Sequence, residues 1–185
     1  MSRVAPIQNI HDTDIADMLA ISKKMMGFKS VDTLIMAHQP EMLKSSAAWI
    51  QTILRGGNVD PGLKRMIGYI CSTSYGCTYC SAHTTYTAIF YNVDEEKMKE
   101  AWTYETSALF SDQEKAALNL ALRSSQQPNQ STDEDFDRLR KYFSEEEIVE
   151  IVFTISMYAF LNRFNSTMQT ELEEAPRQVL ASLKL

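Results

Sequence analysis

The sequence predicts an all-α protein, a helical bundle of about eight helices. Helix start signals recur from one end of the chain to the other, whereas only 6 glycines and 5 prolines occur among 185 residues. No segment of useful length alternates apolar and polar residues, as a half-buried strand would. A chain of this length fits one domain with a substantial core. We therefore expect a single all-helical domain over residues 1–185.

Four helices are expected in the first half of the chain, at about residues 13–26, 40–54, 61–75 and 77–91. Asp12 or Thr13 can cap the first, since a side-chain oxygen at this position accepts an otherwise unpaired backbone N–H. Asp60 before Pro61 is an N-cap followed by proline, which suits the first turn of a helix. Gly76 separates the last two helices, because glycine readily adopts the left-handed conformation that ends many helices.

The second half continues with helices at about 95–102, 112–122, after Ser131, at 145–164 and near the C-terminus. Three of these starts show the pattern of a capping box, in which serine is followed three positions later by glutamate: Ser111–Glu114, Ser131–Glu134 and Ser144–Glu147. Asp94 caps the helix at 95–102, residues 124–130 form the clearest loop, and Pro176 ends or restarts the last helix. The segment 148–161 is apolar on nearly every side, so we expect it to be buried centrally or against another subunit.

Charge and composition disfavour several classes of function. The net charge is −6 and there is no basic run, which argues against a nucleic-acid partner. The apolar segment 148–161 is short and interrupted by Glu150, so we expect no membrane span. The N-terminal residues have no apolar signal core. Three clustered cysteines do not form a secreted disulfide scaffold, and a C-x-x-C pair without an export signal indicates cytoplasmic redox or metal chemistry.

The most informative motif is Cys77-Thr-Tyr-Cys80-Ser-Ala-His83. Its two cysteines and histidine are spaced by three, so they share one face of a helix. A helix that begins after Gly76 presents unpaired N–H groups to the cysteines, and such sites lower a thiol pKa from about 8.5 into roughly the 3.5–7.5 range. One thiol can attack a peroxide, the other can close the disulfide, and His83 can move the proton. The helix dipole alone favours Cys77, the more exposed of the two, as the attacking thiolate.

Two other interpretations of the motif stay open at this point. Cys77, Cys80 and His83 could be three ligands of an open metal site, although no fourth ligand is apparent in the sequence. The same residues could also be small buried side chains with no chemical role. Cys71 has apolar neighbours on the preceding helix and is expected to be a core cysteine.

The sequence around the motif resembles the carboxymuconolactone decarboxylase superfamily, and most closely its AhpD-like, peroxidase-related branch. The likeness is carried by residues 63–84, which include the C-T-Y-C-S-A-H core, and by later patterns at 111–118 and 144–165. It covers roughly residues 40–170. The resemblance implies an all-α homo-oligomer, often a trimer or hexamer, that acts as a thiol-dependent alkyl hydroperoxide reductase (a peroxidase) or as a disulfide reductase. It also implies that no metal or organic cofactor is needed.

The resemblance assigns roles to the motif residues. Cys80 would attack the peroxide or disulfide substrate, Cys77 would resolve the product, and a thioredoxin-like or dihydrolipoyl-type reductant would recycle the pair. Two departures from the family pattern stand out: the histidine is at His83 rather than one position later, and Arg65 replaces the relay glutamate twelve residues before Cys77. Arginine cannot act as a base, but it could hold a thiolate or an anionic substrate by charge. Glu150 is the candidate replacement for the missing glutamate.

Two alternatives to the peroxidase or disulfide reductase stay open, and the missing relay glutamate supports the first of them. The first is a non-enzymatic helical oligomer whose dithiol is a redox sensor or a structural staple. The second is a cofactor-free lyase or isomerase that acts on a small carboxylic acid, with Lys64 and Arg65 as the anion-binding residues. Activity that survives replacement of both cysteines would support the second alternative.

Overall fold

The computed structural model of the protein describes residues 1–184, which fold into ten α-helices and one short 3-10 helix. Leu185, the last residue of the expected domain, lies outside the described residues. No strand occurs within residues 1–184, so the all-α prediction is confirmed. The helices are α1 (Thr13–Met26), α2 (Val31–Met36), α3 (Pro40–Arg55), α4 (Pro61–Tyr75), α5 (Thr78–Phe90), α6 (Glu95–Lys99), η1 (Ala101–Thr103), α7 (Asp112–Ser124), α8 (Asp133–Leu139), α9 (Glu145–Met168) and α10 (Glu174–Leu183).

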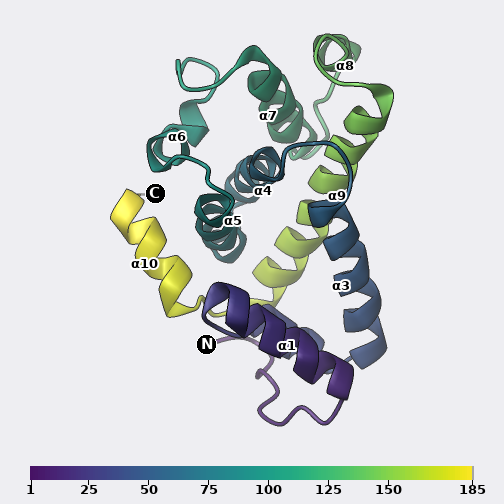
Figure 1. Ribbon diagram of the computed structural model, residues 1–185, viewed down its shortest axis with the longest axis vertical. Helices are drawn as coiled ribbons and strands as arrows, with labels where there is room; N and C mark the ends of the chain where they lie inside the picture. The colour runs from purple at the N-terminus through teal and green to yellow at the C-terminus, as the bar shows by residue number, and fades with distance from the viewer. Residues whose placement is uncertain (185) are drawn as a thin grey trace.

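Helix α4 lies at the centre of the fold. It packs against α5, α7 and α9, while α10 lies along the outer side of α5 and α3 runs beside α9 (Figure 1). Ten of the fifteen residues of α4 are buried, among them Ile67 and Ile70, which are fully inaccessible. The central position of α4 holds the start of α5, and therefore the cysteine motif, in a rigid setting.

A close approach between α4 and α9 depends on Gly68. A Cβ atom placed on Gly68 would lie 2.2 Å from the ring of Tyr158, which is far inside van der Waals contact. The Tyr158 ring is 3% exposed and therefore packs directly on the backbone of α4. Glycine is unfavourable inside a helix by about 1 kcal/mol, so its presence here reflects this packing.

The junction between α4 and α5 forms as the sequence predicts. Gly76 has the left-handed conformation (φ 79°), and the N–H of Cys77 donates to the carbonyl of Ser72 at 2.9 Å. This arrangement satisfies carbonyl groups at the end of α4 that would otherwise lack a partner. The chain reverses within one residue, and Cys77 becomes the N-cap of α5.

Three expectations about the helices need correction. Helix α2 was not expected, because its six residues are too few to show a period. The helix expected at 95–102 ends at Lys99, and the chain continues as the 3-10 helix η1. Helix α8 is capped by Thr132 and Asp135 rather than by Ser131 and Glu134. The buried Asp135 carboxylate accepts both from the Thr132 N–H and from side chains of α7, which makes it the better partner.

Helix α9 is buried on one side only. Ile151, Met157 and Tyr158 face the core, whereas Val149 and Phe153 are 53% and 51% exposed. Within one chain, the segment 148–161 is therefore not buried centrally, and its burial against another subunit stays a prediction. No helix within residues 1–184 combines the length and apolar character needed to span a bilayer.

Candidate active site

The two motif cysteines lie at the first turn of α5. Cys77 is the N-cap, and its Sγ accepts the backbone N–H of Cys80 at 3.3 Å. Both thiols are free and buried, with exposed fractions of 2% for Cys77 and 4% for Cys80. The expectation that Cys77 is the more exposed of the pair is therefore wrong, because α9 and the segment before α10 cover it.

The two thiols in the first turn of α5 have very different pKa values. The Cys80 thiol donates to Cys77 and the Cys80 N–H adds a second hydrogen bond, which together lower the pKa of Cys77 to about 7 despite its burial. The hydrogen bond to Cys77 and burial both raise the pKa of Cys80. The pair therefore loses its first proton near neutral pH and holds the second, with the charge on Cys77. This agrees with the thiolate that a helix start was expected to favour.

A cavity of about 310 Å³ opens beside Cys80. It lies between α1, α3, α5 and α9, and its wall is mostly apolar, with four methionines among the lining residues. Cys80 lines the cavity, whereas Cys77 does not. The side-chain amide of Asn165 points at the Cys80 sulfur from α9, with 3.6 Å between Nδ2 and Sγ. A small apolar molecule in this cavity would meet Cys80 first.

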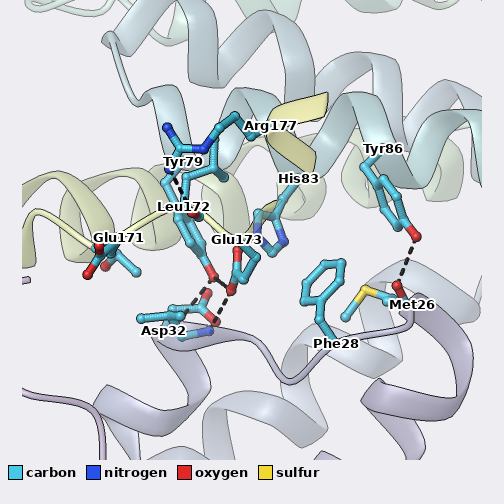
Figure 2. A network of polar contacts seen from close by, with 12 residues as sticks. Met26, Phe28, Asp32, Tyr79, His83, Tyr86, Glu171, Leu172, Glu173 and Arg177 are labelled. Carbon is cyan, nitrogen blue, oxygen red and sulfur yellow. Dashed lines mark hydrogen bonds and ion pairs between the residues drawn. The ribbon is translucent and has the colours of Figure 1, made fainter. Parts of the chain in front are cut away.

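His83 lines the same cavity, one turn after Cys80 on α5. Its ring stacks on the ring of Tyr79 with centroids 4.2 Å apart, and the edge of Phe28 lies on another side of it. The Nε2 atom of His83 is 2.6 Å from a carboxylate oxygen of Glu173 (Figure 2). The structure therefore places Cys80 and His83 at one cavity, with the histidine held by a carboxylate.

Glu173 is the site residue that the sequence did not reveal. It precedes α10, and its carboxylate accepts from the Tyr79 hydroxyl at 3.0 Å (Figure 2). It also accepts from the Val31 N–H at 2.6 Å. Burial opposes the charge, but the hydrogen bond and charge of His83 and the Val31 N–H hold the pKa of Glu173 below its usual value. Ninety residues separate Glu173 from His83, and no local pattern links them.

Arg65 lines the cavity from α4. Its Nη1 donates to the Tyr158 hydroxyl at 3.4 Å, and its guanidinium lies over the ring of Tyr91, 5.0 Å from the centroid. It forms no ion pair with a carboxylate among residues 1–184. Arg65 is thus a half-buried cation whose protein partners are two neutral tyrosines.

Lys64 and Glu150, two residues considered for the site, lie elsewhere. The ammonium group of the buried Lys64 pairs with Glu150 and donates to the carbonyl oxygens of Ile53 and Gly56. Glu150 also accepts from the backbone of the loop between α3 and α4. Glu150 is therefore no substitute for the relay glutamate, and Lys64 is not available to bind an anion at the cavity.

The structure also bears on the role of Cys71 and on the metal-site interpretation of the motif. Cys71 is buried beside Ala121, and burial raises the pKa of its thiol to about 12, as expected for a core cysteine. Within residues 1–184, no group of three or more His, Cys, Asp or Glu side chains is placed so that it could hold a metal ion. Cys77, Cys80 and His83 in particular do not converge as ligands.

Comparisons with known proteins show what the chain and its fold are similar to. No protein-family model matches the chain, and no curated protein matches it. Among solved structures, the debrominase Bmp8 shares 30% of its sequence with this chain, covers 97% of both chains and superposes with a TM-score of 0.90. A cysteine-to-alanine variant of Bmp8 in complex with 2,3,4-tribromopyrrole is 29% identical, also with a TM-score of 0.90.

Peroxidase-related proteins share the fold at lower identity. One from Ralstonia eutropha JMP134, described as having an alkylhydroperoxidase AhpD core, is 19% identical over 95% of this chain and 94% of its own, with a TM-score of 0.84. Another from Silicibacter sp. TM1040 is 15% identical over 91% and 92%, with a TM-score of 0.82. At 30% identity over 97% of both chains, this chain belongs to the same family as Bmp8, and it shares the fold of the AhpD-like, peroxidase-related proteins that the sequence resembles. The name of Bmp8 states an activity, which is debromination.

Proposed function

We propose that the protein is a dithiol-dependent reductase that transfers two electrons from Cys77 and Cys80 to a small, mostly apolar molecule. One observation carries this proposal: a thiol pair whose first proton is lost near pH 7 adjoins an apolar cavity lined by Cys80. The catalytic residues are Cys80 as the attacking thiol, Cys77 as the resolving thiol and His83 as the proton carrier.

An alkyl hydroperoxide is the first proposed substrate class. Cys80 passes its proton to Cys77 and attacks the terminal peroxide oxygen. The O–O bond breaks and Cys80 becomes a sulfenic acid, while the alkoxide takes the proton from Cys77 and leaves as an alcohol, so that Cys77 is a thiolate again. The Cys77 thiolate then attacks the Cys80 sulfur, and His83 protonates the departing hydroxide to give water. The balance is one hydroperoxide and two thiols to one alcohol, one water and one disulfide.

A brominated aromatic ring is the second proposed substrate class, and the similarity to Bmp8 over 97% of both chains favours it. The same two electrons would replace a C–Br bond by a C–H bond. The products would be the debrominated ring, a Cys77–Cys80 disulfide, bromide and a proton. The polarizable sulfurs of the methionine-rich wall suit a large, soft atom such as bromine.

Either reaction leaves a disulfide that must be reduced again. We propose a thioredoxin-like or dihydrolipoyl-type dithiol as the reductant, and the cytoplasm as the compartment that supplies it. Disulfide exchange of this kind proceeds by attack of a thiolate on one of the two sulfurs. A disulfide substrate would be reduced by the same chemistry in the opposite direction.

We also propose that the chain forms a homo-oligomer, a trimer or hexamer, through the outer face of α9. Val149, Val152, Phe153 and Phe160 follow a helical spacing on this face and are all exposed, and Trp49 of α3 packs on Phe160 with ring centroids 6.3 Å apart. We call these five residues the outer stripe. A contiguous apolar surface of this kind is typical of an interface. A second copy of the chain is the occupant that would bury it.

The test is a stoichiometric reaction of the fully reduced protein, without oxygen, with an alkyl hydroperoxide and separately with tribromopyrrole. We expect two thiols to be lost per chain and one equivalent of alcohol or of bromide to form with one of the two substrates. The Cys77→Ser and Cys80→Ser variants should each form no intrachain disulfide. Thiol loss without a product would instead favour a redox sensor. Substrate turnover that survives both replacements would favour the lyase or isomerase.

A further inference from the structure

We propose that Arg65 and Tyr158 form a subsite for the negative charge of the substrate, so that the preferred substrate is an apolar molecule that carries one acidic group. This inference rests on the proposed function, because it describes the substrate of the same cavity. It assigns Arg65 a role in binding rather than in proton transfer. The acidic group is a carboxylate or a similarly placed deprotonated ring atom.

The first argument is the uncompensated charge of Arg65. A cation taken out of water costs several kcal/mol unless an opposite charge compensates it. Among residues 1–184, the Arg65 guanidinium has the Tyr158 hydroxyl as its hydrogen-bond partner and the Tyr91 ring as its cation–π partner, and both are neutral. Burial opposes the charge, but interactions with the two tyrosines keep the pKa of Arg65 above its usual value, so the side chain stays charged.

Lys64, the neighbouring residue on α4, is a buried cation that has only a structural role, and it can be compared with Arg65. Lys64 is 1% exposed, and its ammonium group has the Glu150 carboxylate and two backbone carbonyl oxygens as partners. Three groups therefore use its three donors. Arg65, one position along, has five donors, of which Tyr158 accepts one. The contrast indicates that the missing partner of Arg65 is supplied by a ligand.

The third argument is position. Arg65, Tyr158 and Cys80 all line the same cavity, whose wall is otherwise mostly apolar. The Tyr158 hydroxyl accepts from Arg65 and can donate its own proton onward, so a ligand anion could be held by both residues at once. Asp32, the one acidic residue of the lining, accepts from the backbone N–H of Thr33 at 2.7 Å through Oδ1, and it forms no ion pair with Arg65.

The proposal predicts a charge preference that does not depend on thiol chemistry. Two redox-inert probes with the same apolar body, 3-phenylpropanoate and its amide 3-phenylpropanamide, are titrated into the reduced full chain by calorimetry at pH 7.5. We expect the acid to bind about tenfold more tightly or better, the usual value of a hydrogen-bonded charge. Arg65→Gln should remove the preference, and Tyr158→Phe should reduce it in part.

Three further variants make the outcome decisive. Arg140→Gln removes an exposed arginine that pairs with Glu145 away from the cavity, and it should leave the preference unchanged. Loss of the preference in Arg55→Gln, at the cavity mouth, with retention in Arg65→Gln would overturn the proposal. So would equal binding of acid and amide, or no binding of either. The Cys77→Ser/Cys80→Ser double variant should keep the preference, so failure of the redox proposal and failure of the subsite are distinguishable.

Discussion

The ionisation of the thiol pair offers a direct test of the electrostatics at the start of α5. With a pKa of about 7, half of the Cys77 side chains are thiolates at pH 7. At the ordinary value of 9.0, only about one in a hundred would be. The ultraviolet absorbance of the thiolate, followed from acid to alkaline pH, should therefore show about one thiolate per chain appearing around neutrality.

The contributions to this shift can be separated by replacing Cys80. Cys80→Ala removes the side-chain donor but keeps the backbone N–H, so the Cys77 transition should move to higher pH. Cys80→Ser retains a hydroxyl donor and should keep most of the shift. Cys77→Ser should abolish the low transition altogether. Cys71 does not interfere, because burial raises its pKa to about 12.

Two results would refute this account of the pair. The first is a wild-type protein in which both motif thiols titrate together near pH 9. The second is a Cys80→Ala variant that titrates like the wild type, which would mean that the Cys80 thiol does not stabilise the charge on Cys77. The rate of thiol oxidation by the substrate should also rise as pH increases through 7, because the reactive species is formed over that range.

Three further predictions concern packing, the carboxylate beside His83 and assembly. Gly68→Ala should lower the free energy of unfolding by roughly 1–3 kcal/mol in urea, although alanine favours helices, because its Cβ would overlap the buried Tyr158 ring; an unchanged or raised midpoint would contradict the close approach. Glu173→Gln should lower the free energy of unfolding by about 1–3 kcal/mol at pH 7. Because the pKa of Glu173 is lowered by folding, its carboxylate stabilises the protein above its unfolded pKa, and this contribution is lost as pH falls through the folded pKa; the deficit should therefore shrink in acid, and equal deficits at pH 7 and at pH 3 would argue against it. Phe153→Glu should shift the mass measured by light scattering to that of the monomer, and a wild type that is already monomeric would remove the proposed interface.

The features that the sequence predicted well are those that depend on neighbours along the chain. The ends of helices follow local rules, and the structure shows the predicted ends at Gly76, Cys77, Ser111 and Ser144. The short helix α2 was not predicted, because six residues cannot display a helical period.

Contacts between distant segments were not predictable in this way. Glu173 reaches His83 across ninety residues and from outside the region of family likeness. Lys64 was expected to bind an anion and Glu150 to replace the relay glutamate, yet the two form a buried pair. The loop between α3 and α4 has room for the Glu150 carboxylate because Gly57 has no side chain. Pairing of this kind depends on how α3, α4 and α9 meet in space.

The helix-dipole argument favoured Cys77 as the attacking thiol, whereas the family resemblance favoured Cys80. The structure supports part of each expectation. Hydrogen bonds from the thiol and the N–H of Cys80 place the charge on Cys77, the residue that the dipole argument also favoured, but Cys77 does not line the cavity. Cys80 lines the cavity, as the family resemblance requires, but holds its proton. The two become compatible if Cys77 acts first as the base for Cys80 and only afterwards as the resolving nucleophile. Proton transfer between the thiols would then precede attack, so Cys77→Ser should slow the attack by Cys80 as well as prevent formation of the disulfide.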